Sequence, residues 1–142
     1  MAQVSRFPLD KDVEEEITKE FWWIIANLQD EKEVKTFLGD LLTKTERVMI
    51  SKRLAIALLL VQGYTYAQIR EVLKVSPATV NQIHRWLERG GEGYKIAVER
   101  LLKKEKMEKF FEKLNRFLDQ AMLPFKGDIR SRTRWGLKIE EP

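Results

Sequence analysis

The stretch from Tyr64 to Trp86 constrains the fold most strongly, because it predicts two short helices joined by a tight turn. Thr65 and Gln68 have the spacing of a capping box, which starts the first helix. Ser76 followed by Pro77 is typical of a second helix start. The apolar residues have the spacing that two steeply crossing helices need for a shared core: Ile69, Leu73, Val75, Val80 and Ile83. The pattern predicts a helix-turn-helix, whose second helix enters the major groove of DNA.

The outward face of the second predicted helix favours DNA reading over an ordinary helical hairpin. A hairpin packed in a core would explain the apolar spacing equally well. The outward side chains, however, are small, amide and guanidinium groups: Ala78, Asn81, Gln82 and Arg85. Amide and guanidinium groups form hydrogen bonds with base edges, whereas a solvated face usually carries Lys and Glu. We therefore expect Asn81, Gln82 and Arg85 to read bases.

Other residues of the motif and its surroundings are candidates for contacts with the DNA backbone. Ser76, Ala78 and Thr79 begin the second helix, and we expect them beside a phosphate or a thymine methyl group. The remaining candidates for phosphate contacts are Lys52, Arg53, Tyr66 and Gln68.

The charge distribution agrees with a nucleic-acid partner. The chain has a net charge of +4, which alone is weak evidence. Residues 1–46 contain 6 basic and 11 acidic residues, a net charge of −5, so the remainder contains 20 and 11, a net charge of +9. The basic part would face the phosphates and the acidic part would lie away from them.

Helical spacing of apolar residues recurs outside the motif, so an all-α fold is expected. The run Leu54–Val61 is apolar on all sides, which predicts a central buried helix. Gly90, Gly91 and Gly93 are expected to break the chain after the motif. Helices outside the motif are predicted at Asp10–Leu28, from about Asp30 to Leu42, from Thr43 to Gln62 and at Tyr94–Lys104.

The first predicted helix carries more apolar surface than one stripe can bury. Trp22 and Trp23 widen the face that Val13, Ile17 and Phe21 begin. A partner subunit is one way to cover this surface, and an internal core is the other. The sequence leaves both open.

The C-terminal region is expected to be a helix followed by a basic tail. Residues 105–123 have an amphipathic pattern at helical spacing, which indicates packing on the body or on a second subunit. The tail, residues 124–142, has five basic residues between Phe125 and Lys138 against the single acid Asp128, with Trp135 among them. Such an arm would add phosphate contacts or enter a minor groove. A tail that is partly disordered or packed on the body is the alternative.

The sequence contains no pattern typical of an enzyme. It has no cysteine and a single histidine, His84, which lies on the helix expected to face DNA. Gly90–Gly93 follows a helix and lacks the lysine of a phosphate-binding loop. The longest unbroken apolar run, Leu54–Val61, is far too short for a membrane span, and the N-terminus lacks the apolar stretch of a signal peptide. We expect an intracellular protein that acts in the cytoplasm, at the nucleoid, with no metal and no cofactor.

From Leu41 to about Leu102 the chain resembles the tryptophan-repressor superfamily, and within it the YerC/YecD-type branch. The matching points are Thr43–Arg47, Lys52–Arg53, Gly63, Ala78–Val80 and Gly91–Tyr94. The resemblance implies an all-helical, intertwined homodimer. Its two helix-turn-helix units would reach successive major grooves of a near-palindromic operator.

The resemblance also bears on the corepressor. In the tryptophan repressor, a tryptophan is held between the central helix and the DNA-facing helix. Arg53 matches one arginine that contacts the ligand, but Gln82 stands where the second arginine is expected. Glutamine lacks the flat guanidinium that stacks on the ligand. Ile83 and Trp86 replace small residues, so they would fill the space, with Trp86 as a permanent core residue. We therefore expect no tryptophan corepressor.

These observations predict a dimeric, sequence-specific DNA-binding regulator, most simply a repressor. A helical protein-interaction module that has lost DNA binding is the main alternative, and the DNA-binding piece of a transposase-like system is another. The expected organisation is a DNA-binding domain at residues 1–104 with its helix-turn-helix at 65–89, an amphipathic helix at 105–123 and a basic tail at 124–142.

Overall fold

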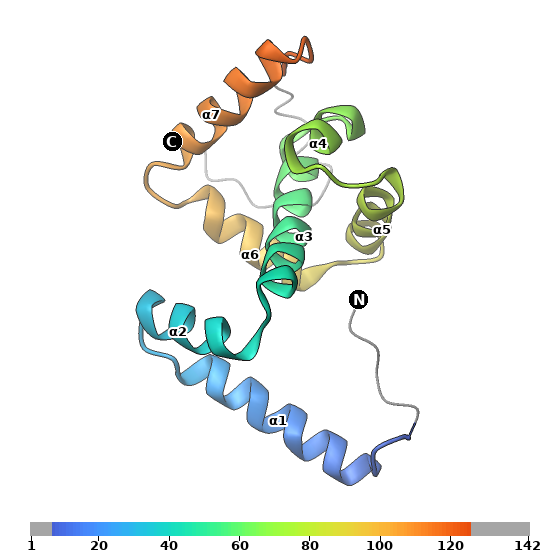
Figure 1. Cartoon of the computed structure of the whole chain (residues 1–142), viewed down its shortest axis with the longest axis vertical. Coiled ribbons are helices and arrows are strands. Elements are labelled where there is room, and N and C mark those ends of the chain that lie inside the picture. The colour runs from blue at the N-terminus through green and yellow to red at the C-terminus, as the bar shows by residue number, and fades with distance from the viewer. Residues whose placement is uncertain (1–6, 126–142) are drawn as a thin grey trace. The chain divides into compact units, whose positions relative to one another are not determined.

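The computed structural model describes residues 7–125, and over this range the chain is entirely helical (Figure 1). The all-α expectation is therefore confirmed. The described residues form seven helices: α1 (Lys11–Asn27), α2 (Glu31–Leu41), α3 (Lys44–Gln62), α4 (Tyr66–Leu73), α5 (Pro77–Glu88), α6 (Glu92–Leu102) and α7 (Met107–Gln120). None of these helices is both long and apolar enough to cross a membrane.

Side-chain caps start the first three helices close to the expected residues. The Asp10 carboxylate accepts a hydrogen bond from the backbone N–H of Asp12 at 2.9 Å. Asp30 caps α2 in the same way, through the backbone N–H of Glu33 at 2.8 Å. Thr43 and Glu46 form a reciprocal pair of bonds at 3.1 and 3.2 Å. Each cap satisfies backbone donors that a helix start leaves unpaired.

The chain divides into two compact units, residues 1–49 and residues 50–142. In the N-terminal unit, none of the described residues, 7–49, is buried. Trp22 and Trp23 are 63% and 60% exposed, and Ile17 is 54% exposed. The internal core that the sequence left open for α1 is therefore not formed within this unit.

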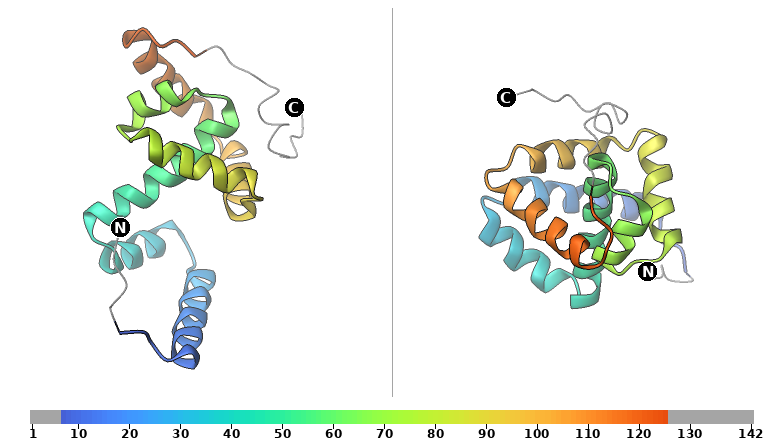
Figure 2. Two further views of the ribbon diagram at one scale, coloured as in Figure 1. Left: turned by 90° about the vertical axis from the view of Figure 1, so that its right-hand side faces the viewer. Right: turned by 90° about the horizontal axis from the view of Figure 1, so that it is seen from above.

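The C-terminal unit is built around the second half of α3. Ile56–Val61 is buried, as the apolar run predicted. Helices α4 and α5 lie on one side of α3, and α6 and α7 lie on the other (Figures 1 and 2). The remaining buried apolar residues come from all four of these helices or from the loop before α4: Tyr64, Ile69, Val80, Ile83, Leu87, Val98 and Leu118.

The corner between α5 and α6 depends on a glycine. Gly91 has φ +54°, and an added Cβ would lie 3.0 Å from the Cα of Leu87 and 3.1 Å from the carbonyl oxygen of Trp86. A side chain would therefore be strained and would clash with backbone. Gly93 does not break the chain as expected, because α6 begins one residue earlier, at Glu92.

The C-terminal helix packs on the first helix of the motif, α4. Leu118 is fully buried, and Met107, Phe111 and Leu114 pack against the core. The helix is shorter than the expected range 105–123, because Lys106 and Met122, with φ of 67° and 61°, leave the helical conformation at its two ends. The tail from residue 126 onward lies outside the described residues.

Candidate nucleic-acid interface

The turn between α4 and α5 has the geometry of a helix-turn-helix. Thr65 and Gln68 form the predicted capping box, with bonds of 2.8 and 3.2 Å. Ser76 caps α5 by accepting a hydrogen bond from the backbone N–H of Thr79 at 3.2 Å, and Pro77 occupies the first helical position. Lys74 has φ 53° and ψ 54°, the left-handed conformation that glycine adopts most easily. For a residue other than glycine, the left-handed conformation costs about 1–2 kcal/mol.

Two contacts of the Lys74 side chain accompany this strained backbone. Its ammonium group lies 3.4 Å from the Glu71 carboxylate and 5.6 Å from the centre of the Phe117 ring. A cation over an aromatic ring contributes about 0.5–1 kcal/mol at an exposed site. Because Phe117 belongs to α7, the turn is tied to the C-terminal helix as well as to α4.

Helix α5 separates an apolar face from a polar one. Val80, Ile83 and Leu87 are buried against the core. The expected base-reading residues Gln82 and Arg85 are exposed, and Asn81 is half-buried at the edge of the same face. Of the residues expected near the backbone, Ser76 and Ala78 are exposed and Thr79 is half-buried. The two hydroxyls of Ser76 and Thr79 lie 2.9 Å apart. The helix thus leaves this polar face accessible.

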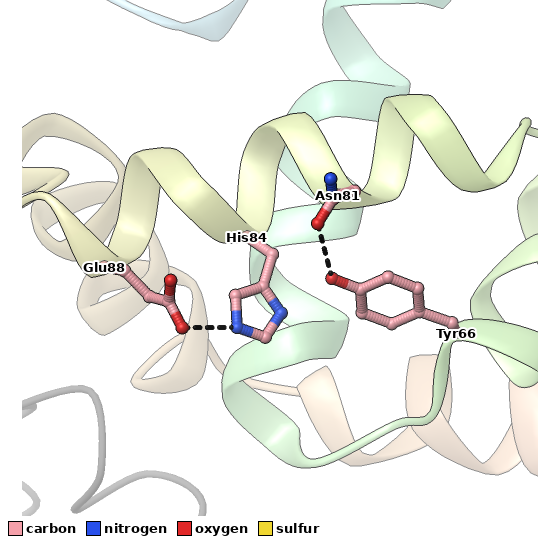
Figure 3. A network of polar contacts seen from close by, with 4 residues as sticks. All are labelled: Tyr66, Asn81, His84 and Glu88. Atoms are coloured by element: carbon pink, nitrogen blue, oxygen red, sulfur yellow. Dashed lines mark hydrogen bonds and ion pairs between the residues drawn. The ribbon is translucent and has the colours of Figure 1, made fainter.

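Polar contacts connect the start of α4 to the middle of α5 (Figure 3). The Tyr66 hydroxyl lies 3.5 Å from Oδ1 of Asn81, and the Asn81 amide nitrogen points away from the tyrosine. The Tyr66 ring packs edge-on against His84, whose Nε2 is 2.9 Å from a Glu88 carboxylate oxygen. Burial, with a smaller effect of Glu88, raises the pKa of Tyr66, while Arg85 opposes the shift. The hydroxyl therefore stays protonated and donates to Asn81.

The two basic candidates on α3 are half-buried. The Lys52 ammonium group lies 3.5 Å from the backbone carbonyl of Lys74, so it sits beside the turn of the motif. Arg53 is the next residue of α3. Among the described residues, no group of three or more acidic, histidine or cysteine side chains is arranged to hold a metal ion.

Comparison with known proteins decides the family. The family model described as Trp repressor protein matches residues 16–102 of the chain. The chain belongs to the Trp repressor family. It is also 33% identical over 81 residues to the uncharacterized protein YerC of Bacillus subtilis (strain 168), an alignment that covers 57% of this chain and 78% of YerC. No solved structure matches the chain significantly. These findings support the YerC-type branch and a family of helix-turn-helix DNA-binding regulators rather than enzymes.

One expected phosphate contact of this Trp repressor family protein is not available. Gln68 is only 7% exposed. Its Oε1 accepts from the backbone of Thr65, and its Nε2 lies 3.3 and 3.0 Å from the carbonyl oxygens of Leu123 and Pro124. The side chain is therefore used inside the fold. The capping pattern was visible in the sequence, but the contact with residues more than 50 positions away was not.

The expectation that Trp86 fills the family's ligand pocket as a core residue is wrong. Trp86 is 60% exposed, whereas Ile83 is 5% exposed. The difference follows from helix geometry: Val80, Ile83 and Leu87 take the side of α5 that meets the core, and Trp86 falls to the flank of that side. The residue is an exposed aromatic of the motif rather than part of its interior.

Tyr64 is a supporting residue that the sequence pattern did not single out. It is 4% exposed, and its hydroxyl donates to Oδ1 of Asn115 on α7 at 2.8 Å. Burial raises the pKa of Tyr64 to about 12, although the bond with Asn115 works in the other direction. Tyr64 lies between the buried end of α3 and the cap of α4, and this position in the sequence could have indicated that its side chain is buried.

Proposed function

We propose that this member of the Trp repressor family is a sequence-specific DNA-binding transcriptional regulator that acts as a homodimer and represses by occluding its operator. The observation that carries the proposal is the exposed polar face of α5, held on a capped helix-turn-helix. This action would take place at the nucleoid, in the cytoplasm. A duplex DNA titration over a range of salt concentrations tests it, and a lack of salt-dependent binding to any sequence would refute it.

Each residue of the interface has a distinct role in this proposal. Gln82 and Arg85 read bases from the exposed face of α5, and Asn81 offers its amide nitrogen from the edge while Tyr66 holds its oxygen. Ser76, Ala78 and Thr79 lie close to the DNA backbone or a thymine methyl group. Lys52 and Arg53 contact phosphates, whereas the single O–H of Tyr66 is already donated to Asn81. Gln68 is buried, so we do not include it among the proposed phosphate contacts.

The exposed apolar surface of α1 supports the homodimer. A monomer rarely leaves such a surface in water, and the described residues of the N-terminal unit include no buried side chain. A second copy of the chain supplies the missing cover, in a closed two-fold arrangement. Two helix-turn-helix units related by this symmetry would read half-sites about one helical turn apart. Selection of bound sites from a random duplex pool should return a two-fold symmetric consensus.

Replacing Arg85 with alanine should weaken operator binding and relax specificity at one base position. A guanidinium group that contacts a base contributes about 1–3 kcal/mol of discrimination. The measurement is a mobility shift with the selected consensus and with its single-base variants. Arg100→Ala is the matched control, because it removes the same charge from an exposed position on α6. Equal losses of affinity in the two variants would show that Arg85 acts only through charge.

We also propose that the protein does not use tryptophan as a corepressor. Gln82 stands at the position of a ligand-binding arginine, and the buried Ile83 occupies the place of a small residue. Because Trp86 is exposed, this proposal rests on these two residues alone. Isothermal titration should detect no tryptophan binding at micromolar ligand, and operator affinity should not change when tryptophan is added. Micromolar binding would overturn the proposal.

A further inference from the structure

The side chain of Asn81, a candidate base reader, already uses part of its hydrogen-bonding capacity inside the protein. Its Oδ1 lies 3.5 Å from the Tyr66 hydroxyl, and its amide nitrogen points away from the tyrosine (Figure 3). An amide oxygen can only accept, so the hydroxyl donates this hydrogen bond. The NH2 group is therefore the part of the Asn81 amide that is left for a partner.

The position of the Tyr66 hydroxyl is set by local contacts on both helices of the motif. Tyr66 is the first residue of α4, directly after Thr65, whose capping box fixes the start of this helix. Its ring packs edge-on against the His84 ring, with the centroids 5.7 Å apart. His84 in turn lies 2.9 Å from a carboxylate oxygen of Glu88, one turn further along α5. The hydroxyl therefore meets Asn81 in a defined position before any DNA is bound.

This arrangement determines which base Asn81 can read. An asparagine that reads adenine uses both ends of its amide, because the oxygen accepts from N6 of the base and the nitrogen donates to N7. Such a contact requires the oxygen and the nitrogen to face the same base edge. The oxygen of Asn81 faces Tyr66 instead. Asn81 thus presents a hydrogen-bond donor to the groove without the acceptor that adenine needs.

A side chain that only donates discriminates among the bases of the major groove. Guanine presents two neighbouring acceptors there, O6 and N7, and no donor. Adenine places the donor N6 beside its acceptor N7, and thymine offers the single acceptor O4. Cytosine presents only the donor N4. An NH2 group therefore matches guanine best and cytosine worst.

We propose that Tyr66 is a positioning residue that sets the base specificity of Asn81. By engaging the amide oxygen, Tyr66 makes Asn81 read guanine through its NH2 group rather than adenine through both ends of the amide. The inference rests on the proposed DNA-binding function and assigns a base to one of its readers. The role of Tyr66 is indirect, because its hydroxyl acts on the DNA only through Asn81.

Tyr66→Phe in the full chain tests this role, because it removes the hydroxyl and keeps the ring that packs against His84. The freed amide can turn both of its ends toward a base, so the preference at the position read by Asn81 should move from guanine to adenine. The ratio of adenine to guanine affinity should rise by about tenfold, the discrimination that one well-formed bidentate pair supplies. Selection of bound sites from a random duplex pool, followed by titration of single-base variants of the consensus, measures this ratio.

Two further variants make the test specific. Asn81→Ala identifies the base position, because it should abolish the preference there and leave the rest of the consensus unchanged. Adding Tyr66→Phe to Asn81→Ala should then have no further effect at that position, which a double-mutant cycle measures. Tyr94→Phe is the matched control, because it removes a hydroxyl from α6, outside the motif. It should leave every base preference unchanged.

The outcomes separate this inference from the proposed function. If the wild-type chain binds no duplex DNA, the proposed function fails and the inference fails with it. If it binds and Tyr66→Phe weakens all sequences alike, the hydroxyl has a structural role only, and the inference alone is refuted. A wild-type preference for a base other than guanine at the Asn81 position would also refute it. So would an Asn81→Ala variant that keeps every preference, because Asn81 would then read no base.

Discussion

Replacing Ile17 and Phe21 of α1 with aspartate should dissociate the protein into monomers and lower its operator affinity by about a hundredfold or more. The two side chains are four residues apart, on one face of the helix, and are 54% and 37% exposed in the single chain. In the proposed dimer both are covered, so each aspartate would place an unpaired charge in an apolar interface, at a cost of several kcal/mol. A dimeric reader that becomes monomeric also cannot engage two half-sites at once, so the gain from bivalent binding disappears, a factor of about 10²–10⁴.

Analytical ultracentrifugation and a mobility shift measure these two effects. The matched control is Lys11→Asp together with Lys19→Asp, which introduces two aspartates on α1 away from the face of Ile17 and Phe21. The control should remain dimeric, although it makes the helix more acidic than the test variant does. If the Ile17 and Phe21 variant stays dimeric at micromolar concentration, the apolar face of α1 is not the subunit interface.

Truncating Leu118 to alanine should destabilise the C-terminal unit by about 2–5 kcal/mol, the cost of a fully buried leucine truncation that leaves a cavity. Leu118 has no exposed surface and anchors α7 to the core. Chemical denaturation of the full chain measures the change in the free energy of unfolding. Because α7 packs on α4, operator affinity should also fall at temperatures near the lowered midpoint.

Met122→Ala is the control for this substitution. Met122 follows α7 and is 87% exposed, so its truncation should change stability by less than about 0.5 kcal/mol. A similarly small effect for Leu118→Ala would mean that α7 does not pack on the body in solution. The position of the helix would then be wrong.

Features that depend on neighbouring residues were predictable from the sequence. The caps at Asp10, Thr65 and Ser76 use side chains within three residues of the backbone groups that they satisfy. The buried run of α3 is likewise set by a local pattern. Short-range hydrogen bonding and helical periodicity are sufficient to locate such features.

Features that depend on distant residues were not predictable. Gln68 fits both an exposed phosphate contact and a buried amide, and only the position of residues 123 and 124 separates the two roles. Trp86 was assigned to a pocket by resemblance, but the rotation of α5 on its core places it at the flank. The sequence could not decide what buries the apolar surface of α1, because a pattern of apolar residues shows that such a surface exists but not which segment or subunit packs on it.

The hydrogen bonds of Gln68 with Leu123 and Pro124, and the stacking of Tyr64 on Phe125, also impose an order on how the protein is made. Tyr64 and Gln68 are synthesised about 60 residues before Leu123–Phe125, an interval of roughly 3–12 s at 5–20 residues per second. During this time the buried contacts of α4 with α7 cannot exist. The nascent DNA-reading motif therefore lacks its support until the C-terminal helix has emerged. A chain that stalls or is cut before residue 118 would present an incompletely packed motif with exposed apolar surface to the proteases and chaperones of the cell.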